Sequence, residues 1–192
     1  MTNWKRPALI GGAVVVVIAL VSVIYAGFTR MASTTPATST AASTAGTPGE
    51  PGRKIKARLF YVSPDGRRLV SVERDVPFGE GTAEQAKAII AAQVAPVGDP
   101  LLSAIPPGTT LRAGFITDKG DAYVDLTPEV SAAHPGGTLN ELLTVYTIVN
   151  ALTANLPAVS AVQILIGGKE VDTLAGHVDL RRPLTRDLSR VE

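Results

Sequence analysis

An uncharged run of 21 residues, from Ala8 to Phe28, constrains this chain more than any other feature of its sequence. A helix of that length, rising about 1.5 Å per residue, is roughly 31 Å long and spans the hydrocarbon core of a bilayer. Lys5 and Arg6 precede the run, and under the positive-inside rule they keep the N-terminus in the cytoplasm. We therefore expect residues 1–30 to be an N-terminal membrane anchor, transmembrane at about residues 8–28, with the C-terminal part of the chain outside the cytoplasm.

A cleaved secretory signal is the alternative explanation of this apolar run. Signal peptides have an apolar core of about 7 to 15 residues, followed by small residues at the cleavage site. The run here is longer, and no Ala-x-Ala-like site follows it. The pattern therefore favours an uncleaved, single-pass anchor in the cytoplasmic membrane.

Residues 31–52 have the composition of a linker. Apart from Met31 and Glu50 they are all Ala, Ser, Thr, Pro or Gly. Such a segment buries too little apolar surface to offset the entropy lost on ordering its backbone, so we expect it to be disordered. As a flexible chain it reaches roughly 25 Å, which is enough to hold a domain clear of the lipid head groups.

The remaining segment, residues 53–192, is long enough for one domain with its own core. The whole chain has 18 Lys and Arg against 17 Asp and Glu, and a net charge of +1 offers no general attraction for nucleic acid. The absence of Cys excludes disulfides, thiolate metal sites and cysteine nucleophiles, and two His are too few for a multi-histidine metal site. These counts predict no nucleic-acid partner, no cofactor and no metal.

Hydrophobic periodicity and turn residues predict two hairpins, two helices and a buried strand in this domain. Each predicted helix starts with a capping box, Thr82 to Gln85 in the first and Thr138 to Glu141 in the second. The predicted elements are strands 56–62 and 69–76, a helix from 82 to Pro96, an ordered loop 98–110, strands 111–117 and 122–126, a helix from 138 to Pro157, a strand 161–166, and weak strand signals at 170–172 and 177–179. We expect an α+β fold, with two amphipathic helices packed on one face of a mostly antiparallel sheet.

Sequence motifs for catalysis or cofactor binding are missing from this domain. There is no Gly-x-Ser-x-Gly elbow, Walker loop, His-Glu-x-x-His motif or dinucleotide fingerprint. Asp118, Asp121 and Asp125 are spaced somewhat like calcium ligands, but they lie in a hairpin pattern, which favours solvated turn carboxylates. Gly167-Gly168-Lys169 follows a strand as a phosphate loop does, but the rest of that motif is absent, so we interpret it as a turn.

The two histidines can be drawn as general-base pairs, His134 with Asp125 or Glu129, and His177 with Asp179. No nucleophile accompanies either pair, and His134 precedes a Pro-Gly-Gly break where surface histidines are common. We therefore expect no catalytic, cofactor-binding or metal-binding residues and no enzymatic activity.

Two further groups of residues have a structural and a functional interpretation. Five aromatic residues lie within apolar patterns, which favours core packing over a stacking platform: Phe60, Tyr61, Phe115, Tyr123 and Tyr146. Two basic clusters are compatible with contacts to anionic wall polymer, lipid head groups or a partner, but acidic residues interrupt the second cluster, which favours solvated surface. The clusters are Arg53, Lys54, Lys56 and Arg58, and Arg181, Arg182, Arg186 and Arg190.

The order of several segments in this domain resembles the GerMN family, which occurs in sporulation and spore germination proteins and in bacterial envelope lipoproteins. The segments that carry the resemblance are LFYVSPDGRRLVSVER (59–74), VAPVGDP before LLSAIPPGTTL (94–111), DKGDAYVDLTPEV (118–130), LLTVYTIVNALTANLPAVSAVQILIGGKE (142–170) and DLRRPLTRD (179–187). The resemblance implies a small βαββα-type unit that acts as a ring-building module outside the cytoplasmic membrane, without an established enzymatic activity. One departure is Gly98-Asp99-Pro100, where the family usually has Gly-Pro.

These observations together predict a membrane-anchored, extracytoplasmic interaction or assembly domain of the bacterial cell envelope, with an envelope protein partner or a second copy of itself bound. Two alternatives stay open. One is an envelope hydrolase acting on peptidoglycan through carboxylates such as Asp125 and Glu129. The other is a sensor for a small ligand or a wall fragment.

The anchor prediction is tested by the intact mass of the protein extracted from membranes. An uncleaved anchor retains the apolar run, so the expected mass is that of the whole chain, 19.9 kDa. A mass lower by roughly the first 30 residues would show that the segment is a removed signal.

Overall fold

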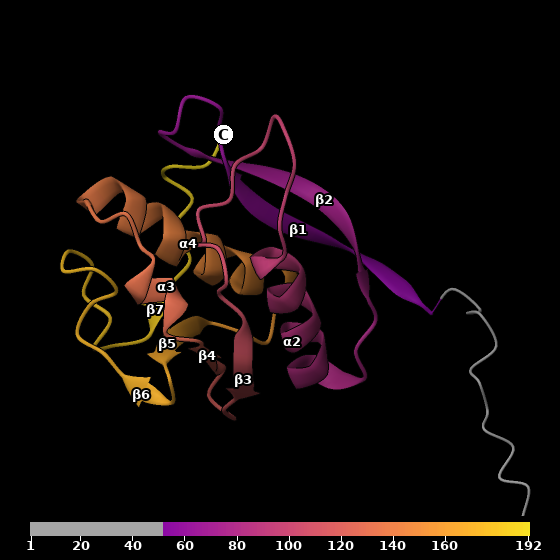
Figure 1. Cartoon of the computed structure of the whole chain (residues 1–192). Coiled ribbons are helices and arrows are strands. Elements are labelled where there is room, and N and C mark those ends of the chain that lie inside the picture. Colours follow the sequence, from indigo (N-terminus) through magenta and orange to yellow (C-terminus); the bar gives the residue numbers. More distant parts are fainter. Residues whose placement is uncertain (1–51) are drawn as a thin grey trace, which may run out of the picture. The chain divides into compact units, whose positions relative to one another are not determined.

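The computed structural model describes residues 52–192 (Figure 1). The predicted anchor and residues 31–51 of the predicted linker lie outside the described residues. Within the described part, no helix combines the length and the hydrophobicity needed to cross a membrane.

The described part contains helices and strands at nearly all the positions that periodicity predicts. The strands are β1 (Lys54–Val62), β2 (Leu69–Pro77), β3 (Leu111–Ile116), β4 (Asp121–Leu126), β5 (Ala161–Ile166), β6 (Lys169–Glu170) and β7 (Leu184–Thr185). The helices are α2 (Gly81–Val94), α3 (Glu129–Ala132) and α4 (Thr138–Asn155). The weak signal at 170–172 corresponds to the two-residue strand β6, whereas the strand signal at 177–179 is wrong.

These elements form three layers, which confirms the predicted α+β class but not the predicted single sheet. The antiparallel hairpin β1–β2 is one layer, helices α2 and α4 are the second, and a sheet in the order β3-β4-β5-β6 is the third, with β7 also paired to β5 (Figure 1). Strands β4 and β5 are parallel, and the other pairs in that sheet are antiparallel. A parallel pair needs a long crossover, and the chain from β4 to β5 supplies it through α4.

Helix α4 lies between the other layers and is buried on nearly all sides. Residues from Leu143 to Thr153 are buried with one exception, Tyr146, which is partly exposed. The sequence predicted an amphipathic helix with one buried apolar stripe, but the buried surface of α4 is wider than that stripe. The reason is that α4 packs against β1, β5 and α2 at once. A helix that contacts neighbours all round is expected to be apolar all round.

The outer edge of β1 is closed by side chains rather than by another strand. The amide of Asn155 accepts from the Arg58 N–H (2.8 Å) and donates to the Arg58 carbonyl (2.7 Å). The amide of Gln93 makes the same pair of bonds to Phe60, at 2.9 and 2.8 Å. Because these groups occupy the edge, the hairpin cannot extend into the larger sheet.

The predicted capping boxes are wrong, although their residues have important partners. Neither α2 nor α4 has a side-chain hydrogen bond at its N-cap. Gln85 instead accepts from the Gly79 N–H (2.9 Å) and donates to the Pro77 carbonyl (3.1 Å). Glu141 accepts hydrogen bonds from the backbone of a distant loop, residues 174–177.

The loop from Ala95 to Thr110 is ordered and partly packed, as predicted. Ile105 is buried, and Leu102 exchanges backbone hydrogen bonds with Val62, at 2.8 and 3.3 Å, which continues the closed edge of β1. The side chain of Leu102 is 46% exposed. Part of this loop forms one wall of an open groove beside α2.

The closed edge predicts unequal effects of two volume-conserving substitutions. Gln93→Met leaves the buried N–H and carbonyl of Phe60 without partners, which costs about 2 to 4 kcal/mol of unfolding free energy. Asn155→Leu affects the exposed backbone of Arg58, which water can solvate, so the expected cost is below about 1 kcal/mol. Urea denaturation of the detergent-solubilised chain, followed by circular dichroism, measures both. Equal losses would mean that the edge bonds do not act as described.

Candidate binding groove

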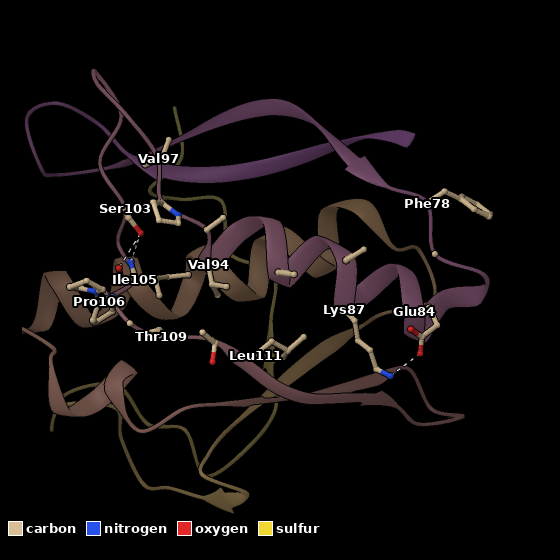
Figure 2. Close-up of a pocket in the computed structure, with 18 residues that line it drawn as sticks. Phe78, Glu84, Lys87, Val94, Val97, Ser103, Ile105, Pro106, Thr109 and Leu111 are labelled. Atoms are coloured by element: carbon tan, nitrogen blue, oxygen red, sulfur yellow. Dashed lines mark hydrogen bonds and ion pairs between the residues drawn. The ribbon is translucent and has the colours of Figure 1, made fainter. Parts of the chain in front are cut away.

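An open groove of about 1060 Å³ runs along the solvent-facing side of α2 (Figure 2). Helix α2 forms one side of the groove, and the segment from Ser103 to Leu111 forms the wall opposite the helix. Most of its lining is apolar. The apolar residues that line it include Ala88, Ala91, Val94, Ile105, Pro106 and Leu111.

The two faces of α2 explain the groove. Ile89 and Ile90 point into the core and are almost completely buried. The opposite face has alanines, among them Ala88, Ala91 and the following Ala95, whose methyl groups leave the space beside the helix unfilled. The predicted apolar stripe of this helix is confirmed for Ala86, Ile89 and Ile90, whereas Val94 is only partly buried and lines the groove. The sequence did not predict that the alanines on the outer face line a groove.

Hydrogen bonds within the wall opposite α2, and from this wall to neighbouring elements, hold it in place. Ser103 bonds to the N–H and carbonyl of Ile105, at 3.0 and 3.1 Å. The hydroxyl of Thr144, on α4, donates to the Ala104 carbonyl at 2.6 Å. The Thr110 N–H donates to the Thr127 hydroxyl at 3.0 Å. The groove is therefore present before any partner binds.

Charged and aromatic side chains mark one end of the groove. Glu84 and Lys87 form an ion pair of 2.7 Å on the helix, and Phe78 lies beyond it (Figure 2). The guanidinium of Arg53 sits 3.8 Å from the centre of the Phe78 ring. Both charged residues of the pair are exposed, so the pair contributes little to stability.

The groove is mainly an apolar surface. Its lining contains no His, and its charged residues, Glu84 and Lys87, neutralise each other. In residues 52–192 no three side chains of His, Asp or Glu come together as metal ligands would. Burial of an apolar segment is the interaction that this surface supports.

The structure separates the histidine pairs considered from the sequence. The ring of His134 contacts neither Asp125 nor Glu129: its Nδ1 accepts from the Gly136 N–H (2.9 Å), so its Nε2 carries the proton and donates to the Thr144 hydroxyl (3.1 Å). Burial lowers the pKa of His134, which is consistent with a neutral ring. His134 is therefore a structural link between a loop and α4.

His177 pairs with Glu141 instead of Asp179. Glu141 is completely buried, yet its carboxylate accepts from three backbone N–H groups at 2.8 to 2.9 Å and lies 3.1 Å from Nδ1 of His177. The three N–H groups belong to Leu174, Ala175 and His177. Asp179 forms a two-pronged ion pair with Arg181, which lowers the pKa of Asp179 well below its usual range. The sequence indicated a cap at Glu141 and missed this role.

The acidic residues singled out in the sequence do not converge. Asp125 accepts from the Gly168 N–H (2.7 Å) and lies 3.3 Å from Nε of Arg112, so it closes the β5–β6 turn. Glu129 bonds to the hydroxyl of Thr127, which lowers the pKa of Glu129. The sequence Gly167-Gly168-Lys169 is that β5–β6 turn, as predicted.

The aromatic residues singled out in the sequence differ in burial. Phe60 and Tyr61 are buried in the core, as predicted. Phe115 is 52% exposed, so its predicted core position is wrong. Its ring stacks on that of Tyr123, with centroids 4.6 Å apart, on the two paired strands β3 and β4. Alternation along β3 places Phe115 on the face of the sheet that the helices leave uncovered.

Comparisons with known proteins identify the fold and a family. A family model described as sporulation and spore germination matches residues 58–172. A structure of the tandem GerMN domains of the sporulation protein GerM from Bacillus subtilis has a TM-score of 0.52 and 21% identity, over 72% of this chain and 47% of that one. The first GerMN domain of the same protein has a TM-score of 0.51 and 18% identity, over 69% of this chain and 98% of that one. At these identities the structures establish a shared fold. No match was found among the curated proteins.

The buried carboxylate predicts a pH-dependent contribution to stability. Burial raises the pKa of Glu141, but the N–H groups of residues 174, 175, 177 and 178 outweigh it and lower the pKa overall. A lowered folded-state pKa means that the stabilisation is complete above the unfolded pKa, about 4.3, and is lost as pH falls through the folded value. Glu141→Gln is expected to cost about 3 kcal/mol at pH 7.

The difference between Glu141→Gln and the unchanged chain is the quantity to measure, by urea denaturation from pH 7 to pH 3. It should decrease below about pH 4, because protonation of Glu141 removes the advantage of the charge. Using the difference removes the contributions of groups that are common to both chains and do not interact with residue 141. A constant difference down to pH 3 would contradict a stabilising carboxylate charge.

Proposed function

Since the chain belongs to the sporulation and spore germination family, we propose that it is a membrane-tethered interaction domain of the bacterial cell envelope. The domain binds an apolar segment of an envelope protein through the groove along α2. The match to the family and the shared fold with the GerMN domains confirm the resemblance carried by the sequence segments.

The extracytoplasmic location in this proposal rests on the sequence. The apolar run 8–28 has the length of a bilayer-spanning helix, and basic residues precede it. The linker that follows is long enough to present the domain to partners near the membrane surface. The family description, sporulation and spore germination, supports a role in the cell envelope, and this general role does not require that the organism forms spores.

The apolar lining of the groove is the observation that carries the proposal. Helix α2 has 14 residues and is roughly 21 Å long, so the groove can hold a partner segment of several residues. Each aliphatic side chain that a partner buries there contributes roughly 1.5 to 3 kcal/mol. Because the opposite wall is fixed by hydrogen bonds, little ordering cost opposes that gain.

A binding role also agrees with the state of the carboxylates considered for hydrolysis. Asp125 is engaged by Gly168 and Arg112, and Glu129 by Thr127. Neither carboxylate lines the groove. We therefore propose a non-enzymatic function, and turnover of purified cell wall that is lost in Asp125→Asn would contradict it.

The groove is tested by photocrosslinking of the full chain in membranes. A photoreactive residue in place of Ala91, in the groove, is expected to capture an envelope protein. The same residue in place of Ala83, exposed on α2 but outside the groove, is the matched control and should not capture it. Ala95, which lines the groove just beyond the end of α2, provides a second probe position.

A second substitution separates contact from folding. Ala91→Glu places a charge in the apolar groove and should lower capture from the probe at position 95 at least fivefold, whereas Ala83→Glu should leave it unchanged. Thermal melts show whether both variants fold equally well. Equal capture from positions 83 and 91, or none from either, would overturn the role of the groove. Capture of a second copy of this chain would mean that the groove serves self-assembly and not binding of a different envelope protein.

A further inference from the structure

A second cleft, separate from the groove, lies where the β1–β2 turn meets the C-terminal tail. It has a volume of about 330 Å³ and is lined by Arg67, Arg68, Ser189, Arg190 and Leu139. We call it the arginine cleft. Three of its five lining residues are arginines, which come from two segments about 120 residues apart in the sequence. Figure 1 shows the chain end beside the turn that joins β1 to β2.

The backbones that carry these arginines are fixed. The Leu69 N–H donates to the Arg190 carbonyl (2.8 Å), and the Glu192 N–H donates to the Leu69 carbonyl (2.9 Å). Further along the tail, the buried amide of Asn150 donates to the Asp187 carbonyl (2.7 Å) and accepts from the Asp187 N–H (3.1 Å). Helix α4 therefore holds the tail against the turn. The backbone atoms from which the arginine side chains extend have fixed positions.

The turn is fixed in the same way. The Ser63 N–H donates to the Arg68 carbonyl (2.9 Å), and the Arg68 N–H donates to the Ser63 hydroxyl (3.2 Å). The Arg67 N–H donates to the Asp65 carboxylate (3.1 Å). Only the side chains of the two arginines stay free to adjust to a ligand.

Nearby carboxylates offset positive charge of the cleft, since Arg67 and Arg68 interact with Asp65, and Arg190 interacts with Asp187. Asp65 is hydrogen-bonded by the Ser63 hydroxyl and the Arg67 backbone, and Asp187 by the Ser189 N–H. Glu192 lies 3.6 Å from Nε of Arg68, and both side chains are more than half exposed. Among residues 52–192, neither Arg67 nor Arg190 forms an ion pair.

From this arrangement we infer that the arginine cleft binds a phosphate group. A guanidinium presents forked N–H donors that match two oxygens of one phosphate, and a phosphate has enough oxygens to accept from more than one arginine. A carboxylate has only two oxygens, so it can engage fewer of the three guanidinium groups at once. A fixed backbone lowers the entropy cost of bringing several arginines to one anion.

Phosphate binding here does not rest on the proposed function of the groove. The groove is lined by α2 and the 103–111 segment, and no residue lines both surfaces. Failure of either test therefore leaves the other result unaffected.

Calorimetric titration of the full chain with pyrophosphate tests the inference, in a maltoside detergent that contains no phosphate. Saturable binding is expected, and Arg67→Gln and Arg190→Gln should each weaken it about tenfold, the typical loss of a charge-assisted hydrogen-bond pair. Arg67→Lys, which keeps the charge but loses the fork, should give an intermediate affinity. All the substituted side chains are exposed, and thermal melts confirm folding.

The matched control is Arg182→Gln, which removes the same charge from an exposed position of the tail outside the cleft. It should change the affinity less than twofold. No saturable binding by the unchanged chain would overturn the inference. So would an Arg182→Gln effect equal to that of Arg190→Gln, because it would reveal only diffuse charge attraction.

Competition with vesicles distinguishes the source of the phosphate. Displacement of pyrophosphate by phosphatidylglycerol vesicles, but not by phosphatidylcholine vesicles, supports the site and assigns it to anionic lipid head groups. Binding of pyrophosphate that neither vesicle displaces supports the site and assigns it to free or polymer-borne phosphate.

Discussion

The burial of α4 between two layers is the constraint from which most of this structure follows. A helix contacted on all sides brings its polar side chains into the core, where each one needs a partner. Asn150 finds its partner in the backbone of Asp187, and Glu141 in the N–H groups around Leu174. The segments around Leu174 and Asp187 have almost no regular secondary structure, and their hydrogen bonds to the buried polar side chains of α4 keep them ordered. Thr147 is an exception, since its hydroxyl has no hydrogen-bond partner among the described residues.

Side-chain amides take the place of strands in this fold. Gln93 and Asn155 each bond to the N–H and the carbonyl of one residue on β1, as a neighbouring strand would. This closes the edge of the first hairpin without pairing it to the larger sheet, and an unpaired edge is otherwise prone to association. The helices therefore lie between two separate sheets. The sequence alone predicted a single sheet.

The two surfaces proposed for binding share a physical origin. In each, hydrogen bonds within the segment or to neighbouring elements fix the backbone, and the outward side chains have little role in the fold. In the groove these are alanines and prolines beside α2, and in the arginine cleft they are guanidinium groups of the turn and the tail. Preorganised surfaces of this kind bind with a low ordering cost. The apolar surface suits a protein segment, whereas the cationic one suits an anion.

The sequence by itself determined the positions and types of the main elements, because helical and strand periodicities are local properties of ten or so residues. It also determined the family, through the order of segments such as 59–74 and 118–130. Only the tertiary structure decided what the polar residues do. The Thr-x-x-Glu spacing at Thr138 is locally a cap, yet Glu141 bonds to residues more than 30 positions away, and Phe115, in an apolar pattern, lies on the uncovered face. The groove and the arginine cleft depend on contacts between distant segments, and no local pattern in the chain encodes such contacts.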